Sequence, residues 1–224
     1  MLKNIKNKIN KFSSFYKKYH LAFVFSLLAS VVFLIYNAYL GIVNKLVFNL
    51  SISIYYFLLV VIRSFSFLEY LKCKKKNKEY SKGIYIALSV LSSVITVVLI
   101  GPVILMLRYE RNVNSNEIVA ISLAAYTTYK MYRAIFNMIS FKKEMNLFIR
   151  QNLTLSIVSA FVSILTLQNT MINVFEQGDK ASMTMLCVIN SNVILVFLFV
   201  FIIVSCVFGI KKQKEDENKE KVWK

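Results

Sequence analysis

Residues 182–209 read SMTMLCVINSNVILVFLFVFIIVSCVFG and contain no Lys, Arg, Asp or Glu. A helix of about 20 apolar residues crosses the roughly 30 Å hydrocarbon core of a bilayer, so this stretch is long enough to span one. Other long apolar stretches precede it, at residues 21–44, 46–68, 84–107, 117–141 and 152–175. The sequence therefore predicts an all-α, polytopic transmembrane bundle of six helices.

The composition of the whole chain agrees with this class of protein. Its 224 residues are 57% apolar and 17% charged, whereas soluble domains are about 45–50% apolar and about 25% charged. We divide the chain into a basic amphipathic interfacial segment at 1–20, a six-helix transmembrane domain at 21–209 and a charged cytoplasmic tail at 210–224. The first two spans are separated by so few residues that we expect a tight hairpin.

The distribution of positive charge predicts the orientation of the spans. Of the 28 Lys and Arg, 21 fall in the two termini and in the loops on the same side, and four fall in the opposite loops. Lys and Arg near short loops are retained on the cytoplasmic side, so we expect both termini in the cytoplasm. This asymmetry also explains the net charge of +17, and we expect no nucleic-acid partner.

The first 20 residues combine an apolar stripe with a lysine-rich face. Apolar and aromatic residues recur at steps of three and four, which is the pattern of a helix lying in the headgroup plane. We predict that this segment binds anionic lipid headgroups, and the alternative is a disordered basic tail. The candidate membrane-surface residues are Lys3, Lys6, Lys8, Lys11, Lys17 and Lys18.

The sequence contains few groups for catalysis or metal binding. It has one histidine and three cysteines, no Cys/His spacing typical of a metal site, and no phosphate-binding glycine loop. No Asp or Glu lies deep in a predicted span. We therefore expect no enzymatic activity and no cofactor.

Polar residues inside the spans follow the helical period. Residues 152–175 are the richest, with a stripe spaced by three and four that consists of Ser156, Ser159, Ser163, Thr166, Thr170 and Asn173. Such stripes face other helices, either as packing contacts or as the lining of a polar pathway. A Ser-x3-Ser step is shared by the first, third and fifth predicted spans, at 21–44, 84–107 and 152–175. This repeat suggests three stacked hairpins.

Residues 117–141 carry the sharpest polar feature, because Tyr126, Lys130, Arg133 and Asn137 are spaced by four, three and four. Lys130 falls near the bilayer midplane, where a cation costs at least about 2.5–3.5 kcal/mol. Since no carboxylate lies at that depth, we predict that Lys130 is held inside the bundle and faces the polar stripe of residues 152–175.

Snorkelling toward the membrane surface is the alternative for Lys130 and Arg133, and it is our interpretation of Arg63. The candidate intramembrane polar site consists of Lys130, Arg133, Arg63, Tyr126, Gln168, Asn169 and Thr170.

Several short motifs resemble one family. They are Tyr36-Asn37-x-Tyr39-Leu40-Gly41, Tyr55-Tyr56 followed by Arg63, Ala125-Tyr126-Thr127-x-Tyr129-Lys130, and Leu167-Gln168 leading to Phe175 and Gly178-Asp179. The chain is similar, over most of its length after the basic segment, to a family of uncharacterised six-span membrane proteins of low-GC Gram-positive bacteria. The resemblance implies a bacterial cytoplasmic membrane and carries no activity or ligand.

Two function classes remain open on the sequence. The first is a structural or interaction component of the membrane, such as a component of an assembly. The second is a small transporter, channel or lipid-handling module whose intramembrane cations attract an anionic group.

Overall fold

The computed structural model describes residues 2–43, 45, 47–75, 80–101, 103–104, 117–140, 146–175 and 180–222. Over these ranges the chain is all-α, as predicted, and no strand occurs among them. The helices are α1 (Leu2–Val43), α2 (Val47–Lys75), α3 (Lys82–Val98), α5 (Glu117–Ser140), α6 (Leu147–Phe175) and α7 (Lys180–Val222).

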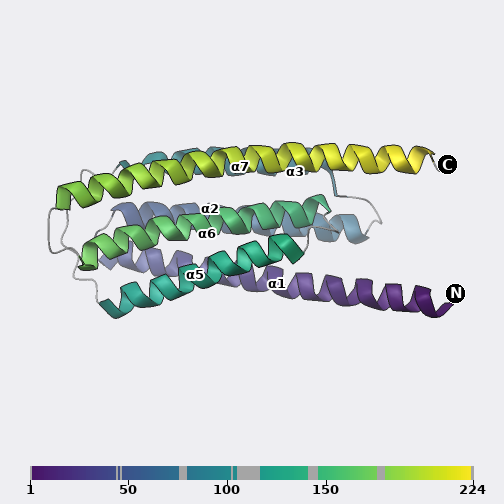
Figure 1. Ribbon diagram of the computed structural model, residues 1–224, viewed down its shortest axis with the longest axis horizontal. Coiled ribbons are helices and arrows are strands. Elements are labelled where there is room, and N and C mark those ends of the chain that lie inside the picture. Colours follow the sequence, from purple (N-terminus) through teal and green to yellow (C-terminus); the bar gives the residue numbers. More distant parts are fainter. Residues whose placement is uncertain are drawn as a thin grey trace.

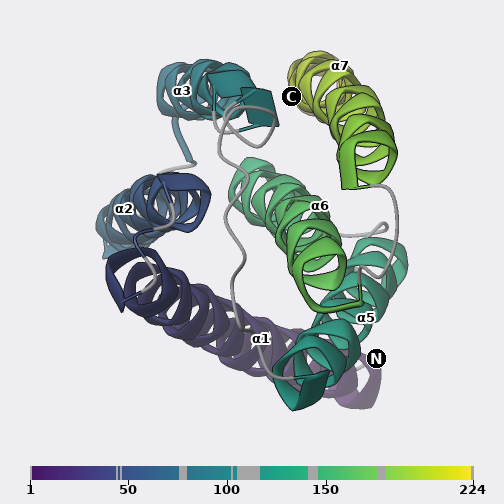
Figure 2. The same cartoon turned by 90° about the vertical axis from the view of Figure 1, so that its left-hand side faces the viewer.

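The helices form a bundle in which α6 is central. Successive helices run in alternating directions, and α1 begins at the same end of the bundle at which α7 ends (Figure 1). Viewed along the bundle, α1, α2, α3, α7 and α5 surround α6 (Figure 2). This position explains the polar stripe of α6, because Ser159, Ser163 and Thr166 are fully buried.

Within the described part of the chain, four helices are long and apolar enough to cross a membrane. The qualifying segments are Phe23–Val43, Val47–Lys75, Leu147–Ile172 and Met185–Lys211. The apolar helix α3 is shorter, and α5, which carries Lys130 and Arg133, is not among the qualifying segments. Length and composition therefore support four of the six predicted spans.

Both terminal helices are longer than predicted. We expected a separate interfacial segment before residue 21, but α1 continues from Leu2 to Val43 without a break and in line with its spanning part (Figure 1). At about 1.5 Å per residue, its 42 residues measure about 63 Å. The tail after residue 209 is likewise helical, because α7 extends to Val222.

The predicted tight hairpin between the first two spans is confirmed. Helix α1 ends at Val43 and α2 begins at Val47, with Lys45 between them at a φ of 53°. Beside this turn the two backbones are very close, since a Cβ added to Gly41 would lie 2.8 Å from the backbone nitrogen of Leu50. Glycine is therefore required for α1 and α2 to approach this closely.

The prediction of three stacked hairpins is wrong for the middle pair. Helices α1 and α2 are neighbours, and so are α6 and α7, but α3 packs against α7 while α5 packs against α6. In their described parts α3 and α5 lie on opposite sides of α6 (Figure 2). The physical reason is that the buried polar face of α6 takes the centre, so the helices around it are not paired by chain order.

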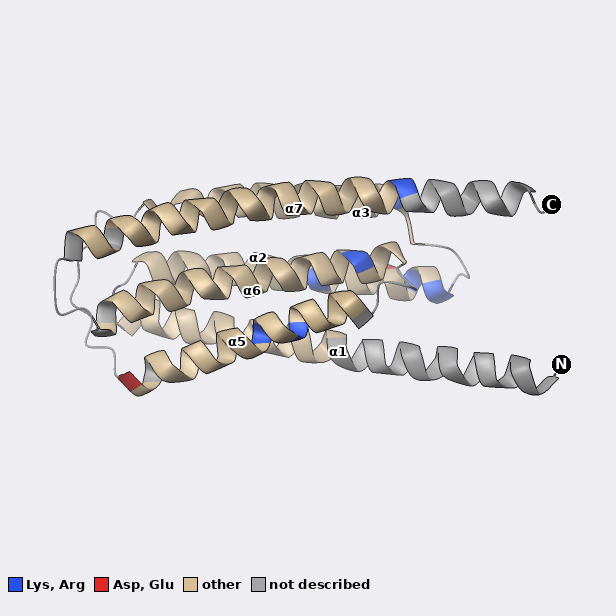
Figure 3. Cartoon of the chain, viewed as in Figure 1, with Lys and Arg blue, Asp and Glu red and all other residues tan. Residues whose placement is uncertain are grey.

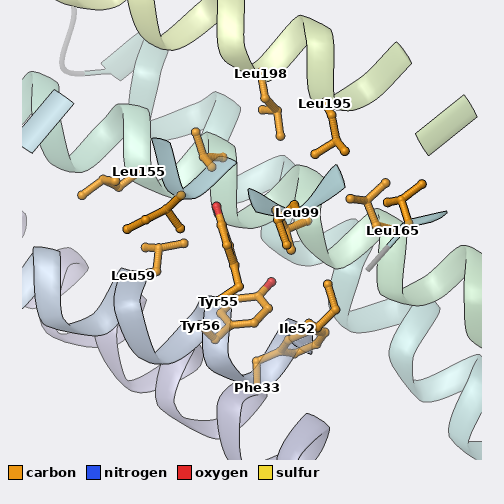
Figure 4. Close-up of a cluster of buried hydrophobic side chains, with 14 of the residues drawn as sticks. Phe33, Ile52, Tyr55, Tyr56, Leu59, Leu99, Leu155, Leu165, Leu195 and Leu198 are labelled. Atoms are coloured by element: carbon orange, nitrogen blue, oxygen red, sulfur yellow. The ribbon is translucent and has the colours of Figure 1, made fainter. Parts of the chain in front are cut away.

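The main hydrophobic core lies between α6 and the helices around it. Its members include Phe33, Ile52, Tyr55, Tyr56, Leu59, Leu99, Leu155, Leu165, Leu195 and Leu198 (Figure 4). Two tyrosines of α2 carry hydroxyl groups into this core, which therefore offers polar partners to side chains from other helices.

Candidate functional site: a cation cluster inside the bundle

Arg63 is the largest fully buried side chain among the described residues, at 1% exposed. It belongs to the inward face of α2, together with Asn49, Ser53 and Tyr56, all of which are buried as their spacing predicts. Our snorkelling interpretation of Arg63 is wrong. Helix α2 continues twelve residues beyond it to Lys75, about 18 Å of helix, and its guanidinium contacts neighbouring helices.

The guanidinium of Arg63 joins α1, α2 and α6. Its Nη1 donates to the Ser26 Oγ at 2.7 Å, the Ser26 carbonyl at 3.1 Å and the Ser30 Oγ at 3.3 Å. Its Nη2 donates to the Ser156 Oγ of α6 at 3.3 Å. Each of these acceptors is a neutral oxygen. Arg63 therefore links three helices without a carboxylate in any of these contacts.

Lys130 of α5 points into the bundle rather than toward lipid. Its Nζ donates to the Tyr56 hydroxyl at 3.1 Å. The same nitrogen lies 5.0, 4.8 and 5.8 Å from the ring centres of Phe33, Tyr56 and Tyr126, within the distance of cation–π attraction. The ammonium therefore occupies an aromatic cage, which we define as Phe33, Tyr56 and Tyr126.

Among the described side chains, Tyr56 connects Lys130 to the central helix. The Tyr56 hydroxyl donates to the Ser159 carbonyl of α6 at 2.9 Å. The predicted inward position of Lys130 is thus confirmed, but its hydrogen-bond partner lies on α2 and not in the hydroxyl stripe of α6. Arg63 is close enough for the two positive charges to repel each other.

The polar strip of α5 lies on its side toward α1, which differs from our prediction. The Tyr126 hydroxyl donates to the Ala29 carbonyl of α1 at 3.2 Å. Against α6 the helix instead places small side chains, because Ala134 packs with Ile157 and Ala160. Small residues allow helices to approach closely in a membrane, so they take this contact and the larger polar residues are displaced to its edge.

Arg133 does not join Lys130 in the interior. It is half-buried, its Nη1 donates to the Tyr129 hydroxyl at 3.1 Å, and its guanidinium lies 5.0 Å from the ring centre of Phe25 of α1. The contact with Tyr129 is on the exposed side of α5. The candidate site therefore separates into an interior part at Arg63 and Lys130 and an outward part at Arg133.

The predicted amide and hydroxyl partners in α6 serve other contacts. The Gln168 Oε1 accepts from the Ser191 Oγ of α7 at 3.4 Å. The Thr170 hydroxyl donates to the Thr166 carbonyl of its own helix. Asn169 is half-buried. Since Lys130 bonds at the level of Ser159 through Tyr56, Gln168 and Thr170 are not its hydrogen-bond partners.

Four contributors to the cluster were missed as site residues. The helical spacing of three serines predicts a buried face but does not identify Arg63 as their partner. These are Ser26 and Ser30 of α1 and Ser156 of α6. Phe33 has no polar signal at all, and only its packing beside Tyr56 and Tyr126 reveals its place in the cage.

The cluster has no acidic counterpart among the described side chains. Among the described side chains the ion pair is between Lys72 and Glu69, on the exposed side of α2 and away from the cluster. No group of His, Cys, Asp and Glu in the described ranges could hold a metal ion. Chemically, the cluster can orient neutral oxygens or attract an anion. The described Lys and Arg lie mainly toward the end of the bundle where the chain begins and ends (Figure 3).

At that end a second polar contact involves Tyr80, just before α3. The Tyr80 hydroxyl and the Ser66 Oγ are 3.2 Å apart. Burial raises the pKa of Tyr80, and the hydrogen bond with Ser66 opposes this shift. The six N-terminal lysines predicted to bind headgroups lie on the helical backbone of α1, but their side chains fall outside the described residues.

Comparison with family models, curated proteins and solved structures finds no match for this chain.

Proposed function

We propose that the chain is a six-span protein of the bacterial cytoplasmic membrane with both termini in the cytoplasm, related to the low-GC Gram-positive family that its motifs resemble. Support comes from the four described helices that are apolar enough to span, the alternating directions of the described helices and the common end of α1 and α7. The excess of Lys and Arg at that end favours the cytoplasm there. Of the basic residues of 1–20, those beside the spanning part of α1, Lys17 and Lys18, would then meet anionic headgroups.

Within that membrane we propose a non-enzymatic structural or interaction role. The observation that carries this is the bonding of Arg63, whose acceptors are hydroxyl and carbonyl oxygens of Ser26, Ser30 and Ser156. A cation already bonded to other helices acts as a link between them. Polar residues of this kind stabilise membrane bundles by about 0.6–2 kcal/mol each.

The experiment measures anion flux and stability on the same proteoliposomes. Chloride and inorganic phosphate serve as probes, and wild type is compared with Lys130→Ala and with empty vesicles. A structural role predicts flux equal to that of empty vesicles for both proteins, with Lys130→Ala changing only the free energy of unfolding. Flux through wild type that Lys130→Ala abolishes, with the fold intact by circular dichroism, would contradict it.

A second candidate function is a small transporter, channel or lipid-handling module with a cationic site for an anionic group. One observation favours it: Arg63 and Lys130 place two positive charges inside the bundle, and the described side chains include no carboxylate at that depth. The same flux measurement is positive if this candidate is correct.

A further inference from the structure

The N-terminal part of α1 extends past the end of α2. In this antiparallel pair, Gly41 of α1 lies beside Leu50 of α2. Counting residues along both helices from this contact places Lys75, the last residue of α2, level with Tyr16 of α1. Residues 2–15, which we call the α1 extension, therefore project about 21 Å beyond α2.

The other helices that contact α1 end at the same level. The hydroxyls of Ser26 and Ser156 lie 3.4 Å apart, and α6 runs parallel to α1 (Figure 1), so Leu147 at the start of α6 is level with residue 17 of α1. Helix α5, which bonds to α1 through Tyr126, also ends near this level. None of these three helices accompanies the α1 extension.

The α1 extension carries a narrow apolar stripe. Its members follow the alternating steps of three and four residues that form the seam of a coiled coil, and they are Leu2, Ile5, Ile9 and Phe12. The same steps continue through Tyr16 and Tyr19 to Phe23, which is buried and stacks on Phe67 of α2. The stripe is thus the continuation of a packed face, at a level where the three neighbouring helices have ended.

The stripe is flanked by positive charge. Residues 1–20 include six lysines and no Asp or Glu. In the seven-residue repeat, Lys6 and Lys8 fall on the two positions beside the stripe, where charges of a facing helix pair. A helix with Asp or Glu at these positions is attracted, and a basic helix is repelled.

The direction of α1 argues against the bilayer surface as the partner of this stripe. The helix continues in line with its spanning part (Figure 1), so the α1 extension leaves the membrane instead of lying in the headgroup plane. Lys3 is 20 residues, or about 30 Å, before Phe23, where the spanning segment begins. Surface charge is screened over about 8 Å at physiological ionic strength.

The α1 of a second copy does not fit on the stripe. The steps of the stripe lead to Phe23, Ser26 and Ser30, whose contacts with Phe67 and Arg63 define the side of α1 that faces α2. A seven-residue repeat drifts by only about 20° per heptad, so a helix on the stripe lies over the inner end of this chain's own bundle. Two copies of α1 facing each other along it would place their bundles in the same space.

Other parts of the chain lack a helix that matches the stripe. The acidic residues of α7 at this end are Glu215, Asp216, Glu217 and Glu220, but residues 211–222 contain Val222 as their one apolar residue. The inner connections at 76–81 and 141–146 are six residues each, fewer than half the length of the α1 extension. The occupant is therefore a helix of another protein.

We propose that the α1 extension binds an amphipathic helix of a cytoplasmic protein, whose apolar residues pack on the stripe and whose Asp or Glu residues face Lys6 and Lys8. This inference rests on the proposed topology and interaction role, and it names the class of partner for that role.

The experiment uses the full-length protein in nanodiscs of zwitterionic lipid, with a labelled synthetic helix as the probe. The probe carries Leu and Ile at steps of three and four with Glu beside them. Its controls are a scrambled peptide of the same composition and a peptide with Lys in place of Glu. Fluorescence anisotropy should show that the probe binds at least about tenfold more tightly than either control. Equal binding of the probe and the scrambled peptide would overturn the proposal.

One variant tests the stripe at constant composition. Ile9→Asn combined with Asn10→Ile keeps the charge and the apolar content of the α1 extension but moves one apolar residue off the stripe. We expect binding of the probe to weaken by about tenfold. Unchanged binding would show that the stripe is not the contact.

A second variant tests the flanking charges. Lys6→Gln combined with Lys8→Gln should weaken binding of the probe by about fivefold. Lys219→Gln combined with Lys221→Gln is the matched control, because it removes two positive charges from α7 at the same end of the protein, and it should leave binding unchanged. Equal effects of the two variants would reduce the contact to general electrostatic attraction and overturn the proposal.

Crosslinking locates the contact independently of affinity. In a background without native cysteines, Ser13→Cys and Ser14→Cys place thiols about 70° and about 170° from the centre of the stripe, at 100° per residue. A cysteine in the probe should crosslink to the first and not to the second.

Two results would assign the stripe to another occupant and overturn the proposal. One is crosslinking of Ser13→Cys between two copies of the protein. The other is quenching of a label at residue 13 by quenchers on the acyl chains of anionic lipid. The flux test of the structural role compares wild type with Lys130→Ala, so its outcome is independent of these results.

Discussion

Replacing Ser26 by alanine should weaken the bundle more than removing the arginine that Ser26 binds. The Ser26 hydroxyl accepts from Arg63 at 2.7 Å, the shortest of the bonds to this guanidinium. Loss of that oxygen leaves a buried charge with fewer acceptors. Replacement of Arg63 by methionine removes the charge together with its desolvation cost, and it leaves no opposite charge unpaired among its described acceptors, which are neutral oxygens. Replacement of whole buried ion pairs by apolar residues is often neutral or stabilising for the same reason.

The structure sets the size of the two effects. A hydrogen bond to a charged group contributes about 1.5–3 kcal/mol. In Ser26→Ala the Ser26 carbonyl and the Ser30 hydroxyl still accept from Nη1, so we expect the free energy of unfolding to fall by about 1.5–2 kcal/mol. Arg63→Met should change it by less than about 1 kcal/mol. In the Arg63→Met background, Ser26→Ala should cost less than about 0.5 kcal/mol.

The assay is reversible unfolding in mixed micelles with increasing sodium dodecyl sulfate, applied to the wild type, both single variants and the double variant. Ser51→Ala is the matched control, because the Ser51 hydroxyl bonds only within its own helix, to the Val47 carbonyl at 2.9 Å. A cost of Ser26→Ala equal to that of Ser51→Ala, or a coupling energy of zero between Ser26 and Arg63, would refute the reasoning.

Three further predictions use other parts of the bundle. Gly41→Ala should lower the free energy of unfolding by about 1–3 kcal/mol through overpacking, because the added Cβ would meet the α2 backbone. Gly101→Ala is the control in the same unfolding assay and should be tolerated, because an added Cβ there has nothing within 4 Å. Burial raises the pKa of Tyr80 above 10.0. The burial of the neutral Tyr80 phenol therefore stabilises the fold fully below pH 10, and this stabilisation is lost as the pH rises further. Tyr80→Phe should remove this loss of stability when the free energy of unfolding is measured against pH. Alkaline phosphatase fused after Lys224 should be inactive and fused within residues 176–181 active, and the reverse result would invert the topology.

The helices and their buried faces could be predicted because those signals are local. An uncharged stretch reveals a span by its length alone, and a step of three or four residues reveals one face of a helix. The inward face of α2, from Asn49 to Arg63, and the stripe of α6 from Ser159 to Thr166 are buried as that rule predicts. The short link at Lys45 likewise limits the first two helices to a hairpin.

The partners of each face could not be predicted, because periodicity contains no information about neighbouring helices. Lys130 and Arg133 differ by about 60° around α5 at 100° per residue, and the edge of the buried face falls between them. Lys130 therefore reaches Tyr56 in the interior, while Arg133 bonds to Tyr129 outside. The aromatic cage around Lys130 includes Phe33, which no polar pattern identifies.

The hydroxyl groups around Arg63 explain how a buried arginine can be accommodated without a carboxylate. The Ser156 Oγ donates to the Asn152 carbonyl of its own helix at 2.8 Å, and the Ser30 Oγ donates to the Ser26 carbonyl at 3.0 Å. A hydroxyl has one donor and two acceptor lone pairs, so its lone pairs stay available for the guanidinium once its proton is bonded four residues back. That the acceptors of Arg63 described above include no carboxylate is therefore not in itself a sign of a bound anion. The hydrogen bonds of Arg63 therefore favour its role as a link between helices. The case for a bound anion depends on Lys130, for which Tyr56 supplies the single oxygen partner among the described residues.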